Sequence, residues 1–328
     1  MKVCVFGAGA IGGLVGARLA QNGVDVSLIA RGPHLAAMRE RGLRCSGIDP
    51  DDDFTVQLPA TDDPAELGVQ DIVFVGLKAH SAAEAAETMT PLLGPDTAVV
   101  PAVNGFPWWY FHGFGDPYEG HQVHAVDPGG AQWNAIGPDR VVGCVVYPAA
   151  DLPAPGHVRH TEGSRMLVGE PDGAVSDRAR VIGRMLTEAG FRAPVRRNLR
   201  GDVWMKLWGN LAFNPVSALT GGTLEELAAD PAVRSVIRAM MQEGEQVANA
   251  LGVKFPLDIE TRIDGAGAVG PHKSSTLQDL EQGRPLEIDA LTLAVSEVGK
   301  LVGVETPTID LVYALVRQRA VTKGCMPA

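Results

Sequence analysis

The stretch Val3-Cys4-Val5-Phe6-Gly7-Ala8-Gly9-Ala10-Ile11-Gly12 decides the fold of the first part of this chain. It reads as an apolar strand that runs into a Gly-x-Gly-x-x-Gly turn and then into a helix. Gly7 allows the tight turn, Gly9 lets a pyrophosphate approach the backbone, and Gly12 lets the helix pack closely on the strand. Free N–H groups and the helix dipole favour anions at such a turn. We therefore predict a dinucleotide site that comprises Gly7, Gly9, Ala10, Ile11 and Gly12.

The residue after the next strand indicates which dinucleotide is bound. Residues 24–30 form a mostly apolar run, and Arg31 follows it roughly twenty residues after the last motif glycine. An acidic residue at this point would hydrogen-bond the ribose 2′-hydroxyl of NAD, whereas an arginine accommodates the 2′-phosphate of NADP. Because residues 32–34 contain no acid, we predict NADP(H) as the cofactor. The alternative interpretation is that Arg31 is a solvated loop charge.

Length, composition and charge limit the class of protein. A chain of 328 residues exceeds what one hydrophobic core usually serves, which favours two domains. The formal net charge of −11 argues against nucleic acid or an anionic membrane surface as the main partner. An anionic substrate would therefore need a local basic site.

Cysteines, histidines and the N-terminus give no sign of a disulfide framework, a metal or export. The four cysteines are scattered, and the eight histidines lack metal-ligand spacing. No apolar run is long enough to span a membrane, and the glycine motif occupies the place of a signal-peptide core. We expect a cytoplasmic protein that binds no metal.

The first part of the chain alternates strand and helix patterns. Apolar runs at 71–77 and 97–100 are typical of parallel strands buried on both faces. Further short strands are expected in an antiparallel extension, and two helices accompany them. These strands are 141–146, 157–160 and 166–169, and the helices are 81–93 and 176–189. We predict an α/β Rossmann-type N-terminal domain over residues 1–197.

From residue 198 the pattern becomes helical throughout. Thr223 and Glu226 form a capping box, and Asp230 with Pro231 begins a helix that Gly252 closes. Other helices are expected at 277–281, 287–302 and 308–319. We predict an all-helical C-terminal domain over residues 198–328.

One helix of this domain carries a polar stripe. Lys206, Asn210 and Asn214 are spaced i, i+4, i+8, so they lie on one helix face over about 12 Å. The residues between them are mostly apolar, and polar groups in such surroundings need partners or a ligand. Pro215 disturbs the helix directly afterwards. The alternative is a solvent-exposed stripe on an amphipathic helix.

Four more polar residues lie where ligands are usually bound. Lys78 and Asn104 follow two parallel strands, at the edge where open α/β sheets bind ligands. Ser275 and Glu287 stand at expected helix starts. The structural alternatives are that Ser275 caps its helix together with Gln278, and that Glu287 only complements the helix dipole.

These motifs together resemble the ketopantoate reductase family, the 2-dehydropantoate 2-reductases. The resemblance runs from Met1 to about Leu315, and six pieces match in order. They are the glycine motif, Arg31, the Leu-Lys-Ala segment at Lys78, Asn-Gly at Asn104, Lys206-x3-Asn210-x3-Asn214-Pro215, and Ser275-x3-Asp279 followed by Glu287. The last two are far more specific than the glycine motif.

The resemblance implies a role for each residue. It makes Lys206 the general acid that protonates the developing alkoxide and Glu287 the group that orients this lysine. It further implies that Asn210 and Asn214 bind hydroxyl and carbonyl groups of the substrate and that Ser275 holds its carboxylate. Lys78 and Asn104 would lie beside the nicotinamide.

Residues 106–138 form an irregular segment that is rich in aromatic residues. It holds eight of the eighteen aromatic residues of the chain: Phe106, Trp108, Trp109, Tyr110, Phe111, Phe114, Tyr118 and Trp133. Long irregular segments in compact domains are usually lids, binding loops or disordered, and the aromatic content argues against disorder. Two interpretations remain open, a lid over the substrate site and a subunit contact.

The sequence thus predicts the NADPH-dependent reduction of a 2-keto acid, 2-dehydropantoate to (R)-pantoate in pantothenate biosynthesis. The alternatives are a related reductase for a bulkier 2-oxo acid, a non-catalytic NADPH-binding sensor, and a hydroxyacid dehydrogenase of the 6-phosphogluconate type. The absence of an arginine cluster near Ser275 argues against a phosphorylated substrate. The expected partner is a small 2-keto acid, and the sequence is compatible with a homodimer.

Overall fold

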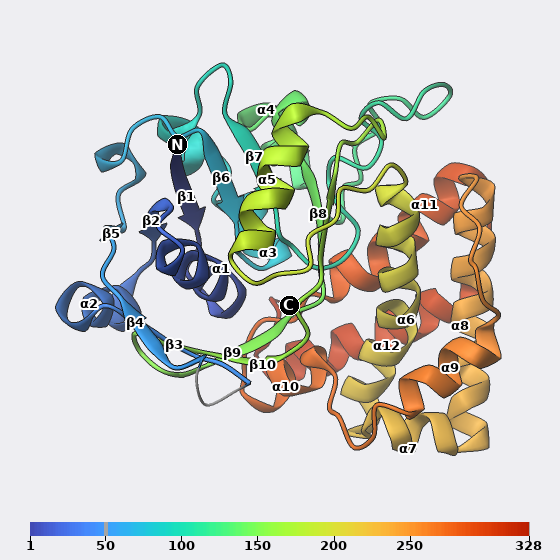
Figure 1. The fold of residues 1–328 in the computed structure, drawn as a ribbon. Coiled ribbons are helices and arrows are strands. Elements are labelled where there is room, and N and C mark those ends of the chain that lie inside the picture. The colour runs from blue at the N-terminus through green and yellow to red at the C-terminus, as the bar shows by residue number, and fades with distance from the viewer. Residues whose placement is uncertain (49–51, 328) are drawn as a thin grey trace. The chain divides into compact units, whose positions relative to one another are not determined.

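The computed structural model describes residues 1–48 and 52–327 (Figure 1). These residues form two compact units. The first contains residues 1–103, 107–122 and 129–199, and the second contains 104–106, 123–128 and the chain from residue 200 onward. Two short segments of the N-terminal half therefore belong to the second unit. The sequence boundary between residues 197 and 198 did not anticipate this interleaving.

A five-stranded parallel sheet forms the centre of the first unit. Its strand order is β5-β2-β1-β6-β7, and every neighbouring pair is parallel. The strands are β1 (Lys2–Phe6), β2 (Asp25–Ile29), β5 (Ala60–Thr61), β6 (Ile72–Val75) and β7 (Ala98–Pro101). The chain builds outward from β1 in one direction and then returns to add β6 on its other side. The carboxyl ends of β1 and β6 therefore form the switch point at which such sheets bind ligands, and the predicted Rossmann-type fold is confirmed.

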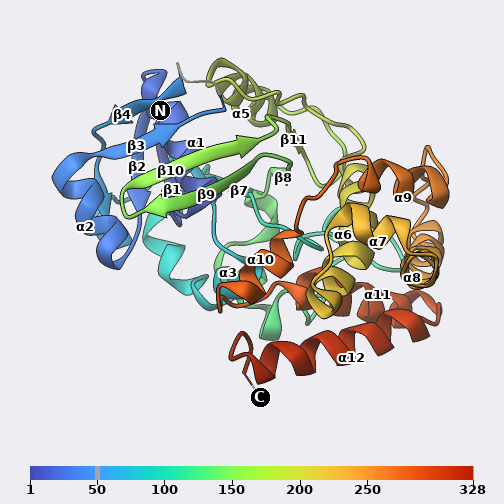
Figure 2. The same ribbon diagram turned by 90° about the horizontal axis from the view of Figure 1, so that it is seen from below.

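Two smaller sheets complete the first unit. A four-stranded sheet has the order β4-β3-β10-β9 (Figure 2), and β8 pairs with β11 in a second, antiparallel sheet. The strands are β3 (Leu43–Ser46), β4 (Phe54–Val56), β8 (Gly143–Val146), β9 (Ala149–Ala154), β10 (His157–Glu162) and β11 (Met166–Gly169). The expected antiparallel pairing is correct for β8 and β11, but β10 also pairs in parallel with β3. These strands form separate sheets, and a single parallel bridge between Val141 and Val99 connects the residues before β8 to β7 of the central sheet.

The helices of the first unit are shorter than expected in one place. The helix predicted over 81–93 is wrong: α3 (Ala79–Glu84) ends early, and a 3₁₀ segment, η3 (Glu87–Leu92), follows it. Pro91 lies inside this segment, and an α-helix does not accommodate a proline there without losing a hydrogen bond. The remaining helices are α1 (Ala10–Gln21), α2 (Gly32–Arg41), α4 (Ala131–Ala135) and α5 (Asp177–Glu188), with short 3₁₀ turns η2 (Pro64–Glu66), η4 (Pro128–Gly130) and η5 (Pro138–Arg140).

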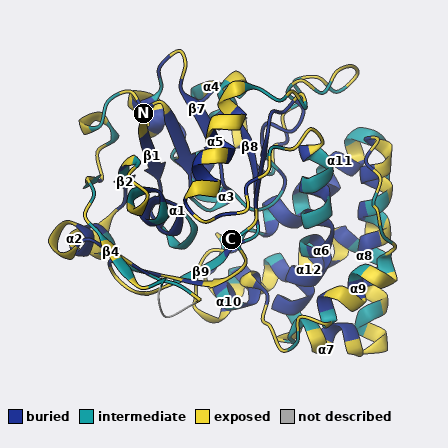
Figure 3. Ribbon diagram, viewed as in Figure 1, coloured by how far each residue is buried: buried dark blue, intermediate teal, exposed yellow. Residues whose placement is uncertain are grey.

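The aromatic segment contributes to the interior of the first unit. Trp108, Trp109, Tyr110 and Phe111 are all at most 5% exposed. Gly143 makes room for one of them, because a Cβ at this position would lie 2.4 Å from the Trp109 ring. Core packing therefore accounts for these four side chains, which neither of the two interpretations from the sequence included. Figure 3 shows how burial is distributed over the elements.

The second unit consists of helices. They are α6 (Leu199–Thr220), α7 (Leu224–Ala229), α8 (Pro231–Ala250), α9 (Ile259–Gly267), α10 (Ser275–Glu281), η6 (Asp289–Leu293), α11 (Ala294–Val302) and α12 (Pro307–Thr322). The capping box of Thr223 and Glu226 and the cap of α8 by Asp230 are both present, as predicted. Helix α6 continues for five residues beyond Pro215. The predicted helix over 287–302 contains a π-helical segment, η6, before α11.

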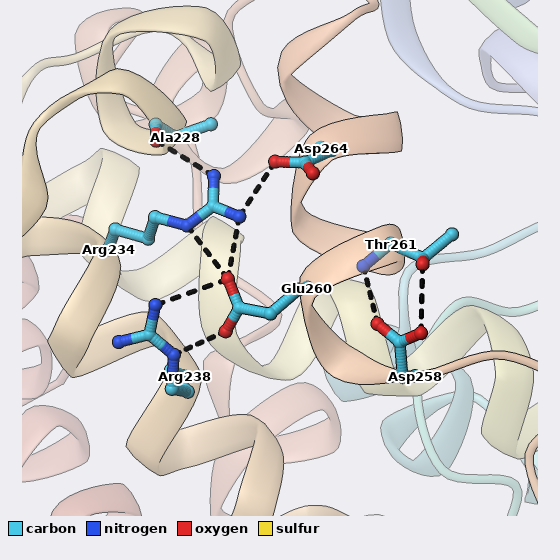
Figure 4. Close-up of polar contacts among 7 residues, drawn as sticks. All are labelled: Ala228, Arg234, Arg238, Asp258, Glu260, Thr261 and Asp264. Carbon is cyan, nitrogen blue, oxygen red and sulfur yellow. Dashed lines mark hydrogen bonds and ion pairs between the residues drawn. The ribbon is translucent and has the colours of Figure 1, made fainter.

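Helices α8 and α9 are joined by ion pairs at the surface (Figure 4). The Glu260 carboxylate accepts hydrogen bonds from Arg234 and Arg238, and Asp264 pairs with Arg234 at 2.7 Å. The two guanidinium groups lower the pKa of Glu260 to about 2. Each exposed ion pair contributes little to the free energy of unfolding. The network links the surfaces of α8 and α9.

No helix among the described residues is long and apolar enough to cross a membrane.

Candidate functional site

The glycine turn after β1 requires glycine at two positions. Gly7 has a φ of +96°, and its N–H and that of Ala8 donate to the carbonyl of Ile29 at 3.1 and 2.9 Å. A Cβ on Gly12 would lie 2.1 Å from the Gly7 carbonyl oxygen, and one on Gly76 would lie 2.8 Å from the Gly12 Cα. The turn, helix α1 and the end of β6 therefore touch backbone to backbone, as expected for this motif.

The third glycine of the motif serves a different purpose. Gly9 has a φ of −70°, and a Cβ on it would come no closer to the rest of the chain than 3.9 Å, at the Gly76 carbonyl. Packing within the protein does not require glycine here. Helix α1 begins at Ala10, and Ile11 is its second residue. No side chain caps the N-terminus of this helix, and the first turn of the helix contains no acidic residue. These residues fit a pyrophosphate group, because the N–H groups and the helix dipole stay available to an anion.

Arg31 follows β2 and stands at the N-cap position of α2. Its side chain is exposed and does not cap the helix. Near it, His34 is partly buried and its Nδ1 accepts a hydrogen bond from the N–H of Gly156 at 2.9 Å. Burial lowers the pKa of His34, which keeps its ring neutral near pH 7. Arg31 is therefore the cationic group at this position of α2.

Lys78 lies at the carboxyl end of β6, where the strand order reverses. It takes the N-cap position of α3, two residues after Gly76, and is partly buried. The predicted placement of Lys78 at the carboxyl end of a parallel strand is therefore correct. Its neighbour Gly76 contacts the glycine turn itself.

The polar stripe on α6 is not solvent-exposed. Lys206 and Asn210 are partly buried, and Asn214 is only 6% exposed. Burying a carboxamide costs free energy unless it is hydrogen-bonded. Within the described residues, the side chain of Asn214 forms no hydrogen bond. A ligand that supplies hydrogen-bonding groups would therefore satisfy it.

Asn104 takes a place that the sequence did not predict. It follows β7, as expected, but it belongs to the second unit. Its Oδ1 accepts a hydrogen bond of 3.2 Å from Nδ2 of Asn210. The structure thus brings Asn104 together with the polar stripe, although 106 residues separate the two asparagines in the sequence.

The two serines at the start of α10 differ in their roles. The expected cap at Ser275 is wrong, because the N-cap is Ser274, whose side chain accepts from the N–H of Leu277 at 3.1 Å. Ser274 is 4% exposed, whereas Ser275 is exposed. The Ser275 hydroxyl makes no hydrogen bond within the part of the chain that the structure describes. The helix does not use this hydroxyl, which leaves it for a ligand.

Glu287 lies directly before the helical residues that lead into η6. Its carbonyl accepts from the N–H of Leu291 at 3.1 Å, and the residue is partly buried. An acid at this position can complement the helix dipole, which leaves the structural alternative for Glu287 open. Two residues later, Asp289 accepts a hydrogen bond of 2.8 Å from the Tyr313 hydroxyl, which ties the start of η6 to α12.

The sequence did not identify Arg262 of α9. Its guanidinium packs against Gly209 of α6, where a Cβ would lie 2.3 Å from Nη2. Gly209 directly precedes Asn210 in the sequence, so Arg262 packs against the same helix that carries the stripe. The only signal in the sequence is a glycine within a helix, which by itself does not identify its partner. Among the described residues, no group of three His, Cys, Asp or Glu side chains could hold a metal ion.

Comparisons with known proteins cover the whole chain. The model of the family "Ketopantoate reductase PanE/ApbA" matches residues 3–173, and "Ketopantoate reductase PanE/ApbA C terminal" matches residues 198–320. The chain is 52% identical to a 2-dehydropantoate 2-reductase of Mesorhizobium japonicum, with 99% of each chain covered. It is 30% identical to a 2-dehydropantoate 2-reductase of Archaeoglobus fulgidus, with 96% of this chain and 97% of the relative covered.

Solved structures show the same architecture. A protein of Ralstonia solanacearum assigned as a ketopantoate reductase has a TM-score of 0.93 at 40% identity, with 99% of both chains covered. A D-mandelate dehydrogenase, solved with NADH and anilino(oxo)acetate, has a TM-score of 0.84 at 22% identity, with 99% of this chain and 100% of that chain covered. At this lower identity, the likeness extends to the fold alone.

Proposed function

The chain belongs to the ketopantoate reductase family, and from this premise we propose that it reduces 2-dehydropantoate to (R)-pantoate with NADPH. The family membership expected from the sequence motifs is thereby confirmed. The relatives named 2-dehydropantoate 2-reductase support the substrate. The reaction is a step of pantothenate biosynthesis.

Lys206 acts as the general acid in this proposal. When bound, NADPH supplies the hydride that is added to the C2 carbonyl of the keto acid. An ammonium group beside the carbonyl oxygen stabilises the negative charge that builds there and then donates a proton to it. Partial burial of Lys206 strengthens this interaction, because water screens it less. Glu287 orients the lysine.

The neighbouring polar groups bind the substrate. Asn214 and Asn210 offer carboxamides to its hydroxyl and carbonyl groups, and Ser275 offers its hydroxyl to the carboxylate. The Asn214 side chain, 6% exposed and without a hydrogen bond among the described residues, is the observation that carries the proposal. A protein that only held a nucleotide would gain nothing from a mostly buried carboxamide that has no hydrogen-bond partner in the described part of the chain.

The cofactor proposal rests on the first unit. Gly7, Gly9 and Gly12, with Ala10 and Ile11, receive the pyrophosphate. Arg31 binds the 2′-phosphate, because a guanidinium matches the geometry of a phosphate group. Lys78 lies on the same edge of the sheet, and we place it near the nicotinamide.

The proposal is tested by assaying a panel of 2-oxo acids with NADPH and with NADH. We expect 2-dehydropantoate and NADPH to give the highest kcat/KM. The panel includes an aromatic 2-oxo acid, which would be preferred if the enzyme reduces a bulkier substrate. No oxidation of NADPH with any member would contradict the proposal and favour a nucleotide-binding sensor.

The variant Lys206→Ala tests the assigned acid. We expect kcat to fall by a factor of about 100 or more, since general acid catalysis contributes about 10²–10⁴-fold. NADPH binding, measured by fluorescence titration, should remain unchanged. Lys300→Ala removes the same charge from an exposed position of α11 and should retain full activity. Equal activity of the two variants would remove Lys206 from the mechanism.

We propose a homodimer as the state in solution. A ketopantoate reductase of Staphylococcus aureus that shares this fold is described as dimeric. Light scattering of the purified protein decides between one and two copies of the 34.6 kDa chain.

A further inference from the structure

The segment 104–106 is fixed to the second unit by its backbone. The N–H of Phe106 donates to the carbonyl of Ala290 at 2.8 Å. Gly105 has a φ of +97°, and a Cβ on it would lie 2.7 Å from both the Cβ and the carbonyl oxygen of Ala290. The Phe106 ring is 3% exposed and meets Trp204 edge to face at 6.1 Å. Only glycine allows the backbone to approach η6 so closely.

The π-helical register of η6 explains why Ala290 can accept this hydrogen bond. In an α-helix, the N–H of Ala294 would donate to the carbonyl of Ala290. Here the N–H of Ala294 donates to Asp289 instead, one residue further back. The Ala290 carbonyl does not receive that bond and accepts from Phe106. Single π turns inside α-helices often occur at functional sites.

This attachment determines where the Asn104 side chain lies. Asn104 directly precedes Gly105, and its Oδ1 accepts from Nδ2 of Asn210. This hydrogen bond occupies the NH₂ group of Asn210 and the carbonyl oxygen of Asn104. The carbonyl oxygen of Asn210 and the NH₂ group of Asn104 are then directed to other partners. An acceptor and a donor side by side suit a substrate that carries both a hydroxyl and an oxo group.

We propose that Gly105 is a positioning residue: its close contact with Ala290 places Asn104 so that Asn104 orients the Asn210 carboxamide toward the substrate. This inference rests on the proposed function of Asn210. The inference goes beyond that function because it assigns the affinity for the keto acid in part to the π turn and to Gly105. Both act through Asn104. A substitution at Gly105 should therefore act on KM for the keto acid through Asn104.

A double-mutant cycle tests this coupling. Gly105→Ala should lower kcat/KM for 2-dehydropantoate at least tenfold, mainly through KM, with NADPH affinity unchanged. In an Asn104→Ala background, the same substitution should change kcat/KM less than twofold. The inference is overturned if Gly105→Ala costs the same factor with and without Asn104, or if it costs less than twofold in the wild type.

Gly303→Ala is the matched control. Gly303 also has a positive φ, of +74°, but nothing lies within 4 Å of the position of its Cβ. It therefore shares the backbone strain of Gly105→Ala without displacing a neighbour. We expect kcat/KM to stay within twofold of the wild type. A tenfold loss in this control would mean that strain alone accounts for the effect.

A second variant keeps the test decisive if Gly105→Ala does not fold. Ala290→Val enlarges the other partner of the contact and leaves Gly105 unstrained. The same tenfold loss, again absent in the Asn104→Ala background, is expected. Failure of the inference differs from failure of the proposed function. In the first case the wild type reduces the keto acid but the cycle is additive, whereas in the second the wild type has no activity.

Discussion

The glycine turn of the first unit and the polar stripe of the second are built on different principles. The turn uses backbone groups of neighbouring residues, and its shape follows from where a Cβ is excluded, at Gly7 and Gly12. The stripe uses side chains, and Asn210 of the stripe donates a hydrogen bond to Asn104, which is far away in the sequence. A backbone site is therefore specified locally, whereas a side-chain site depends on which segments the fold brings together.

The difference also separates folding from binding. In the turn, close packing requires glycine at position 12, whereas a Cβ on Gly9 would come no closer to the rest of the chain than 3.9 Å. At the start of α10, Ser274 serves the helix and Ser275 does not. Each region thus contains a residue that the fold requires beside one that it does not require. Substituting the two members of each pair tests the comparison.

The largest effect is expected at Gly12. Gly12→Ala places a Cβ 2.1 Å from the Gly7 oxygen, so the turn must move, and we expect the free energy of unfolding to fall by about 3 kcal/mol. Gly9→Ala meets nothing closer than 3.9 Å and should change stability by less than about 1 kcal/mol. It should nevertheless weaken NADPH binding at least tenfold. Urea unfolding and fluorescence titration measure both, and native stability of Gly12→Ala would refute the packing argument.

The next effect concerns cofactor choice. Arg31→Glu should weaken NADPH binding by about 100-fold, because charge-assisted hydrogen bonds to a phosphate are replaced by repulsion. The affinity for NADH should change little. Arg41→Glu makes the same charge change at another exposed position of α2 and serves as the control. If both variants discriminate NADPH from NADH like the wild type, Arg31 is only a solvated charge.

The smallest effects are expected at the two serines. Ser274→Ala removes the N-cap of α10 and should lower the free energy of unfolding by about 1 kcal/mol, with turnover near that of the wild type. Ser275→Ala should leave stability unchanged and raise KM for the keto acid several-fold. Thermal unfolding and steady-state kinetics distinguish the two. The opposite pattern would identify Ser275 as the N-cap of α10 and would exclude Ser275 from the substrate site.

Most elements were predictable because their signals are local. The apolar run of β6, the capping box of Thr223 and the Asp-Pro start of α8 each depend on a few adjacent residues. The errors arose where a nearby feature competes with the local pattern. Pro91 converted part of a predicted helix into a 3₁₀ segment. Ser274 and Ser275 could both cap α10 by composition, and burial of the first decided between them.

The sequence indicated which residues are candidates for the site, but it did not indicate how the fold arranges them. The spacing of Lys206, Asn210 and Asn214 is enough to place them on one helix face, and the order of the motifs indicates the family. The π register at Ala290 left no mark in the sequence. The contact of Arg262 with Gly209 left only a glycine within a helix, which does not identify the residue that packs against it.

By itself, the sequence determined the glycine turn, the helical stripe and the family, since each depends on the spacing of residues along the chain. Only the tertiary structure decided that Asn104 joins Asn210, that Asn214 is buried without a hydrogen bond among the described residues, and that the tryptophans 108 and 109 fill a core. The physical reason is that burial and hydrogen-bond partners are properties of segments distant in the chain, which only the folded backbone brings into contact.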